Sequence, residues 1–212
     1  MAIDKSKLEW DRRHNRRWLL IQAAAAALAS APIHAVGAEP AGSVEDVKGE
    51  AFAEAARVRR ALGRAAPLFV GDDVATGAES RLNMLLGRNT NVRLGEKARL
   101  TIDRFLVNAG GDMTLESGPL LFERPAGARP TPIQIRSPFA LIAVRGTRFF
   151  AGPSNGRFGI FVARGSVSVT AAGQRVILRE GEGTDFASPG DPPAPVTRWK
   201  PPRIQASLAS VS

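Results

Sequence analysis

The chain of 212 residues contains no cysteine and no tyrosine, and it has only two histidines. Both histidines, His14 and His34, lie within the first 38 residues. Zinc, copper and non-haem iron sites depend on cysteine or histidine ligands, and Ser-His-Asp and Cys-His catalysis need an imidazole base. Residues 39–212 therefore cannot build these sites, and carboxylates, lysines and hydroxyls are the groups left for catalysis.

Acidic residues are fewer than basic ones, 20 against 29, so the formal net charge is +9. A mildly basic domain allows contact with anionic partners but does not require nucleic acid. The densest basic patch comprises Arg57, Arg59, Arg60 and Arg64. Such a patch is typical of a solvated face, and contact with anionic lipid headgroups or an acidic partner is the functional alternative.

The chain also lacks an apolar run of membrane-spanning length. Its best run, from Trp18 to Ala31, has about 14 residues, whereas a spanning helix needs roughly 20. The run follows Arg16 and Arg17 and precedes Ala38, a pattern that resembles a twin-arginine export signal with its cleavage site. We expect residues 1–38 to be removed on export, which leaves a periplasmic chain without a transmembrane span. An uncleaved inner-membrane anchor is the alternative.

Turn residues divide the rest of the chain into short apolar segments. Leu82, Met84 and Leu86 alternate with polar residues, and similar alternation recurs through residues 92–94 and 160–169. This period predicts short half-buried strands separated by turns. It favours an all-β domain over residues 39–187, folded as a sandwich, a barrel or an irregular solenoid. Within that domain, residues 54–64 fit either a short helix or a polar hairpin arm.

The C-terminal residues 188–212 form a proline-rich tail. Six prolines fall between residues 189 and 202. Because proline lacks a backbone donor, we expect this tail to be extended and not to join the centre of a sheet. Trp199 is expected to fold back on the domain, since large aromatic side chains are mostly buried. A short linear motif for a partner is the alternative for this residue.

Residues from about Val47 to Phe186 resemble the FecR domain family, and four segments together with a closing Gly181-Glu182-Gly183 carry the likeness. The segments are 67–77, 80–87, 138–149 and 163–169. The resemblance implies an antiparallel β-sandwich, or a short irregular solenoid of stacked hairpins, in the periplasm and without enzymatic activity. The family-motif residues, which we interpret as structural, are Gly71, Asp72, Gly77, Arg145, Gly146, Thr147, Gly165, Val167 and Gly181.

In the iron-transport regulators that name this family, the domain senses an outer-membrane transporter. The signal passes through a membrane helix to a cytoplasmic segment that controls a sigma factor. The residues before Trp18 are too few for such a cytoplasmic segment, so we expect a stand-alone exported FecR-like domain.

Two features could carry chemistry, and both have simpler interpretations. Asp72 and Asp73 are the best-paired acids, but aspartate beside glycine is typical of a turn, whereas a glycosidase or a Ca²⁺ site needs several oxygens around one cleft or loop. Gly146 indicates a bulge or a positive φ, and a binding role for Arg145 or Arg148 is the lesser alternative. We therefore predict no catalytic residue, no cofactor and no metal.

Three functions remain open. The first is a non-enzymatic periplasmic module for protein interaction, envelope sensing or signal transduction. Its partner would be an envelope protein or an outer-membrane component, and not nucleic acid. The second is a β-domain that binds an envelope polysaccharide or another ligand, and the third is a carboxylate-based hydrolase.

Overall fold

The computed structural model describes residues 39–106, 110–127 and 131–212, and the structural statements below concern these residues. The predicted export signal, with Arg16, Arg17 and Ala38, lies outside the described residues. Most of the described chain is in strands, so the all-β prediction is confirmed. Neighbouring strands pair antiparallel except β9 and β11, which are parallel.

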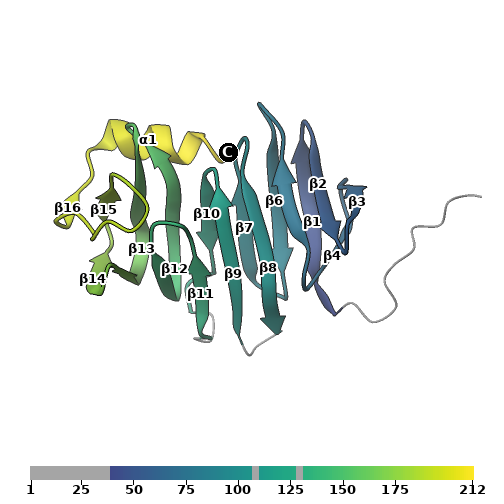
Figure 1. The fold of residues 1–212 in the computed structure, drawn as a ribbon, viewed down its shortest axis with the longest axis horizontal. Helices are drawn as coiled ribbons and strands as arrows, with labels where there is room; N and C mark the ends of the chain where they lie inside the picture. The colour runs from purple at the N-terminus through teal and green to yellow at the C-terminus, as the bar shows by residue number, and fades with distance from the viewer. Residues whose placement is uncertain (1–38, 107–109, 128–130) are drawn as a thin grey trace, which may run out of the picture. The chain divides into compact units, whose positions relative to one another are not determined.

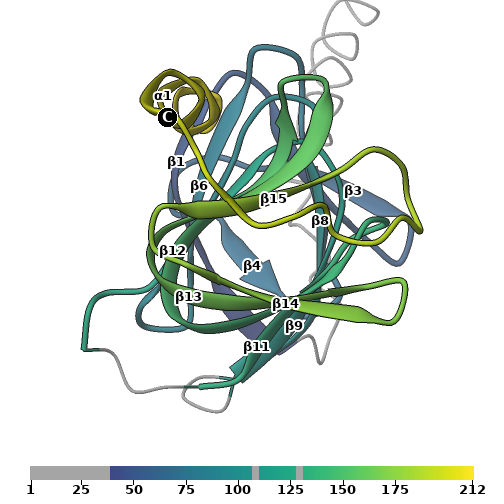
Figure 2. The same cartoon turned by 90° about the vertical axis from the view of Figure 1, so that its left-hand side faces the viewer.

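The hydrogen-bonded strands fold into two layers that face each other (Figures 1 and 2). The first layer runs in the order β3, β2, β5, β8, β9, β11. Their bounds are Val58–Ala61, Ala51–Ala55, Asp73–Thr76, Arg99–Leu106, Gly110–Ser117 and Ile133–Arg136. The second layer runs in the order β10, β7, β6, β1, β4. Their bounds are Leu120–Glu123, Thr90–Leu94, Arg81–Leu86, Pro40–Lys48 and Pro67–Phe69.

Two long strands, β12 (Leu141–Ser154) and β13 (Arg157–Ala171), join the layers at one end. The first part of β12 pairs with β11 and its later part pairs with β10, so this one strand belongs to both layers. β13 follows β12 along its other edge. It then pairs with β14 (Gln174–Arg179) in the first layer and with β15 (Glu182–Phe186) in the second. A short strand β16 (Thr197–Arg198) pairs with β15.

The core lies between the layers and follows from alternation along each strand. Leu82, Met84 and Leu86 of β6 are buried, as are Val92 and Leu94 of the neighbouring β7. Successive side chains of a strand point to opposite faces, so each strand contributes every second residue to the interior. The alternation read from the sequence at these positions therefore marks the inner face correctly.

The C-terminal tail differs from the extended conformation expected. Helix α1, Pro201–Ala209, packs on the outer face of the second layer, as Figure 1 shows. Pro201 and Pro202 do not prevent this helix, because proline is tolerated in the first turn, where the backbone N–H has no intrahelical acceptor to lose. Contacts with the sheet, through Ile204, Leu208 and Val211, supply the stabilisation that so short a helix lacks alone.

Trp199 folds back onto the domain, as predicted, and is only 6% exposed. Its ring stacks on Phe161 with centroids 5.2 Å apart. Gly159 and Gly183 make room beneath it, because a Cβ on either would come within 3 Å of the indole. On α1, Arg203 lies 3.5 Å from the indole centroid. These contacts fasten the tail to β13 and β15.

Among the residues that the structure describes, no helix combines the length and the apolar character needed to cross a bilayer.

Candidate interaction surface

The two adjacent acids Asp72 and Asp73 do not share a site. Asp72 is buried and accepts hydrogen bonds from the Phe69 backbone N–H (2.8 Å) and from the Arg60 guanidinium. Asp73 lies on the outer face of β5 and accepts from Arg99. Within residues 39–106, 110–127 and 131–212, no group of three or more His, Cys, Asp or Glu is placed to hold a metal ion. Each acid is thus engaged with its own arginine, and the pair does not form a two-carboxylate cleft.

Asp72 supports the turn between β4 and β5. Its side chain is 1% exposed, and this burial raises its pKa above the ordinary value, although the Phe69 N–H and Arg60 act in the opposite direction. The hydrogen bond to Phe69 lies within the turn itself, as expected for an aspartate that closes a loop. This motif residue is held inside the fold and is not presented to a ligand.

Three motif glycines lie at the ends of strands. Gly71 and Gly181 have φ values of +88° and +81°, which a side chain rarely adopts. The Gly71 N–H donates to the Ile102 carbonyl and the Gly181 N–H to that of Val162, both at 2.8 Å. Gly77 follows β5, and its carbonyl accepts from a neighbouring loop. The structure thus places these residues at separate turns and does not bring them together.

The remaining motif residues do come together, at a bulge in the β12–β13 hairpin. The register shifts between Arg145 and Arg148, and Gly146 and Gly165 have φ values of +64° and +84°. A Cβ on Gly165 would lie 2.9 Å from the Thr147 methyl group. The bulge thus requires glycine in both strands, for conformation at Gly146 and for conformation and space at Gly165.

Two motif side chains next to this bulge face the core. Thr147 and Val167 are both almost fully buried. They lie where β12 and β13 pass from one layer to the other. Their position indicates that the motif positions the bend in the long hairpin.

Three arginines of the predicted basic patch lie in the hairpin arm β2–β3, and Arg64 follows it, exposed in the loop before β4. Two of the arginines in the arm are used within the fold. The Arg59 guanidinium lies 3.3 Å from the centroid of Phe52, and Arg60 pairs with Asp72 and donates to the Pro67 carbonyl. Arg57 is exposed in the tight turn. The patch is therefore divided between internal contacts and solvent.

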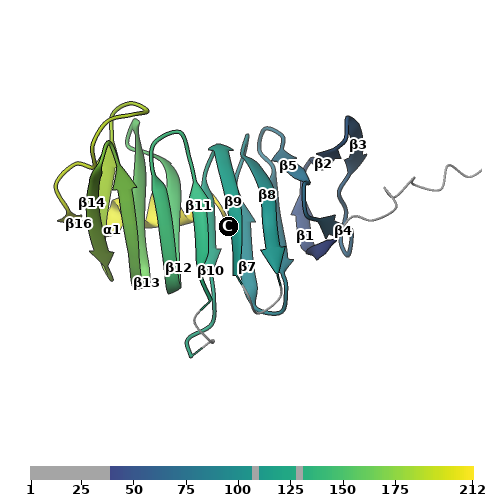
Figure 3. The same cartoon turned by 60° about the horizontal axis from the view of Figure 1, so that its bottom comes forward.

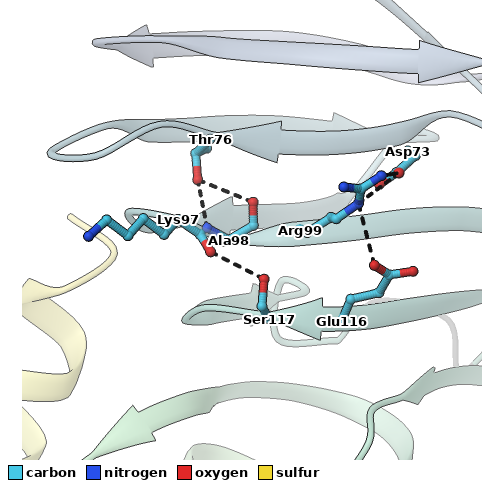
Figure 4. Close-up of polar contacts among 7 residues, drawn as sticks. All are labelled: Asp73, Thr76, Lys97, Ala98, Arg99, Glu116 and Ser117. Atoms are coloured by element: carbon cyan, nitrogen blue, oxygen red, sulfur yellow. Dashed lines mark hydrogen bonds and ion pairs between the residues drawn. The ribbon is translucent and has the colours of Figure 1, made fainter.

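One half of the outer face of the first layer, over β5, β8 and β9, has its charges paired; we call it the paired half. Figure 4 shows its centre, where Arg99 donates from Nε to Asp73 at 2.8 Å and lies 3.4 Å from the Glu116 carboxylate. The hydrogen bond and the charge of Asp73 raise the pKa of Arg99. Farther along the strands, Arg104 pairs with Asp112 at 2.7 Å.

Backbone groups near the paired half are satisfied by a buried hydroxyl. Thr76 Oγ1 donates to the Gly95 carbonyl at 2.6 Å and accepts from the Ala98 N–H at 2.9 Å. Figure 4 shows the contact between Thr76 and Ala98 beside the hydrogen bond from Ser117 Oγ to the Lys97 carbonyl. The loop between β7 and β8 is thereby fixed to β5 and β9.

The other half of the same outer face, over β11–β14, carries Arg136, Arg175 and Arg179, which form no ion pair within the described part of the chain; we call it the arginine half. Two further arginines of these strands, Arg148 and Arg164, lie 3.7 and 3.8 Å from the Glu123 carboxylate of β10. Figure 3 shows these four strands side by side. Their sequences contain no aspartate or glutamate. Arg136, Arg175 and Arg179 are exposed there, and Ala143, Ser166, Ser168 and Thr170 on the same strands are uncharged. Ile177 is 53% exposed in the same half.

The two-residue spacing along residues 175–179 is a sequence signal for this arginine half. Arg175, Ile177 and Arg179 are two residues apart, so one face of β14 presents all three. Alternation in this short segment is as regular as in β6, but it places arginines and an isoleucine outside together. The pairing of β14 with β13 beside β12 and β11 is what joins them into a surface.

Residues 72–168 match the family model described as FecR protein. The chain contains a FecR domain. The match begins at Asp72 in the β4–β5 turn and ends at Ser168 in β13, so it includes the glycine bulge and the paired half. The C-terminal helix and the strand β14 lie beyond the matched residues.

Two crystal structures, at 1.65 and 2.50 Å, resemble the FecR domain; both are described as a “putative anti-sigma factor” from Parabacteroides distasonis ATCC 8503. Each has a TM-score of 0.51 and 15% identity over 64% of this chain. The likeness covers 64% and 63% of those chains, less than two thirds of their length, and it concerns the fold. A search of curated proteins found no significant match.

Proposed function

We propose that this protein is an exported, non-enzymatic FecR-like domain that acts in the periplasm in protein interaction, envelope sensing or signal transduction. The observation that carries the proposal is the FecR match over residues 72–168. The fold shared with the “putative anti-sigma factor” supports a regulatory role. The motif residues contribute to this function by shaping the turns and the hairpin bulge, and the surface beside them makes the contact.

The open outer face of the first layer is the part of the domain best suited to contact a partner. α1 and Trp199 cover part of the outer face of the second layer. The first layer instead presents exposed charges and Ile177 on a regular sheet. A flat sheet face with charge of one sign at one end favours selective recognition of another protein.

Crosslinking in living cells tests the interaction. A photo-crosslinking residue replaces Gln134 on the outer face in one strain and Arg57, in the β2–β3 turn at the opposite end of the strand order, in a control strain. We expect a discrete adduct with one envelope protein from position 134 and none from position 57. Absence of an adduct from any outer-face position, together with saturable binding of envelope glycans, would replace this proposal with the polysaccharide-binding alternative.

Export is tested separately with two arginine pairs. Changing Arg16 and Arg17 to lysine is expected to abolish the periplasmic form, whereas the same changes at Arg12 and Arg13 leave it intact. N-terminal sequencing of the exported protein should begin at Glu39. A product that begins at Met1 in the membrane fraction would support the uncleaved anchor.

A further inference from the structure

A shallow groove of about 440 Å³ lies on the arginine half. Its floor includes small side chains from β12 and β13, with Ala143, Ser166 and Ser168 half-buried between the walls. Pro132, before β11, forms one wall, and Ile177 of β14 lies in the other. Ala143, Ser168 and Ile177 lie in one row, since each is the register partner of the next.

The rim of this groove is positively charged. Arg175 lines the groove and donates from Nε to the Ser168 hydroxyl at 2.7 Å, which directs its guanidinium across the floor. Arg136 belongs to the same row as Arg175 through Leu141 and Thr170. The carboxylate of Glu182, in the turn that follows β14, accepts from the Arg179 backbone N–H at 2.8 Å.

We propose that the groove docks an acidic segment of a partner protein, with an apolar side chain of that segment covering Ile177. The inference rests on the proposed function and names the chemistry of the partner. Charge complementarity carries it, because the four strands beneath the groove have no acidic residue, Arg175 lines the groove, and Arg136 lies in the same row as Arg175. Arginine binds carboxylates with two parallel hydrogen bonds. The exposed Ile177 offers an apolar contact in addition to these charged ones.

A protein segment fits this surface better than an anionic membrane. The paired half continues the same outer face and exposes acids, among them Asp103 and Glu116. A flat lipid surface would meet those carboxylates together with the arginines, and the repulsion would offset the attraction. A narrow segment confined to the groove avoids them. Small floor residues also let a peptide backbone approach the sheet closely.

Fluorescence anisotropy with the purified full chain tests the proposal. The probe is a labelled synthetic peptide in which glutamate and valine alternate, and the matched peptide has glutamine in place of glutamate. We expect the glutamate peptide to bind at least about tenfold more tightly, with the difference shrinking as salt increases. Arg175→Ala should weaken binding about fivefold and Ile177→Ser about tenfold.

Arg57→Ala is the matched control, since it removes an exposed arginine from the β2–β3 turn, at the opposite end of the strand order from β11–β14. Its affinity for the glutamate peptide should equal that of the wild type. Equal binding by the wild type, Arg175→Ala and Ile177→Ser would overturn the proposal. So would Arg175-dependent binding to vesicles of phosphatidylglycerol and phosphatidylcholine without peptide binding, or a dimer in sedimentation that Ile177→Ser dissociates.

The crosslinking strain separates failure of this inference from failure of the proposed function. Loss of the position-134 adduct in Arg175→Ala and Ile177→Ser cells supports docking in the groove. An undiminished adduct in those cells refutes the groove and leaves the interaction role standing. Absence of any adduct in otherwise wild-type cells counts against the proposed function itself.

Discussion

The two halves of one sheet face differ in whether their charged side chains form ion pairs within the domain. In the paired half, Arg99 lies between Asp73 and Glu116, and Arg104 contacts Asp112. In the arginine half, Arg136, Arg175 and Arg179 stand on strands without any acid. Charges paired inside the domain contribute to its own stability, whereas charges left over are available to a partner. The position of a charge on the sheet therefore says more about its role than the net charge of +9.

Replacing the buried hydroxyl beside the paired half should have the largest effect on stability. Thr76→Val leaves the Ala98 N–H, now bonded to Thr76 Oγ1, without its acceptor. Because an unsatisfied buried donor is costly, we expect the free energy of unfolding to fall by about 2 to 3 kcal/mol, measured by urea denaturation. The matched change in the arginine half is Thr170→Val. Because Thr170 is half-exposed, this change should alter the free energy of unfolding by less than about 0.5 kcal/mol. Equal losses would contradict the contrast.

The arginine half should instead depend on backbone conformation at the hairpin bulge. Gly165→Ala combines an unfavourable φ of +84° with a close approach to Thr147, so we expect a loss of about 2 kcal/mol in thermal or urea unfolding. Gly146→Ala has a φ of +64° but no heavy atom within 4 Å of the new Cβ, so about 1 kcal/mol is expected. A larger loss at Gly146 than at Gly165 would show that the close approach to Thr147 does not matter.

The smallest expected effect on stability comes from removing an exposed arginine of the paired half, and it should depend on the salt concentration. Arg99→Ala removes the exposed ion pairs with Asp73 and Glu116 and should lower the free energy of unfolding by at most about 1 kcal/mol in low salt. The difference from wild type should shrink in high salt, because screening weakens surface pairs. Arg175→Ala should leave the unfolding free energy unchanged at both salt concentrations. A salt-dependent loss at Arg175 would mean that the arginine half also stabilises itself.

Much of the fold follows from short-range pattern. Alternation at Leu82, Met84 and Leu86 predicts the inner face of β6, and the glycine at 146 predicts a bulge that the structure has. The helix α1 was missed because its prolines lie at its start, and its stability comes from contacts with the sheet. For residues 54–64 the hairpin arm was one of two alternatives, because Ala55, Val58 and Leu62 also fit a helical spacing.

The candidate surface could be predicted only in part. Arg175, Ile177 and Arg179 share a face by their spacing, and the absence of acids from these strands is visible in the printed sequence. The sequence does not reveal that β14 lies beside β13, or that Pro132 forms the opposite wall of a groove. Asp72 and Asp73 likewise looked like a pair, although Asp72 closes the β4–β5 turn inside the fold and Asp73 begins β5 on its outer face.

The amino-acid sequence alone determined that this is a β-protein without cysteine or histidine chemistry in residues 39–212, because composition and a two-residue period are local properties. Only the tertiary structure decided which charges are paired and which remain exposed. Strand register brings Arg99 to Asp73 across 26 residues of sequence and leaves Arg175 facing serine. Register depends on contacts between distant segments, and those contacts exist only in the folded chain.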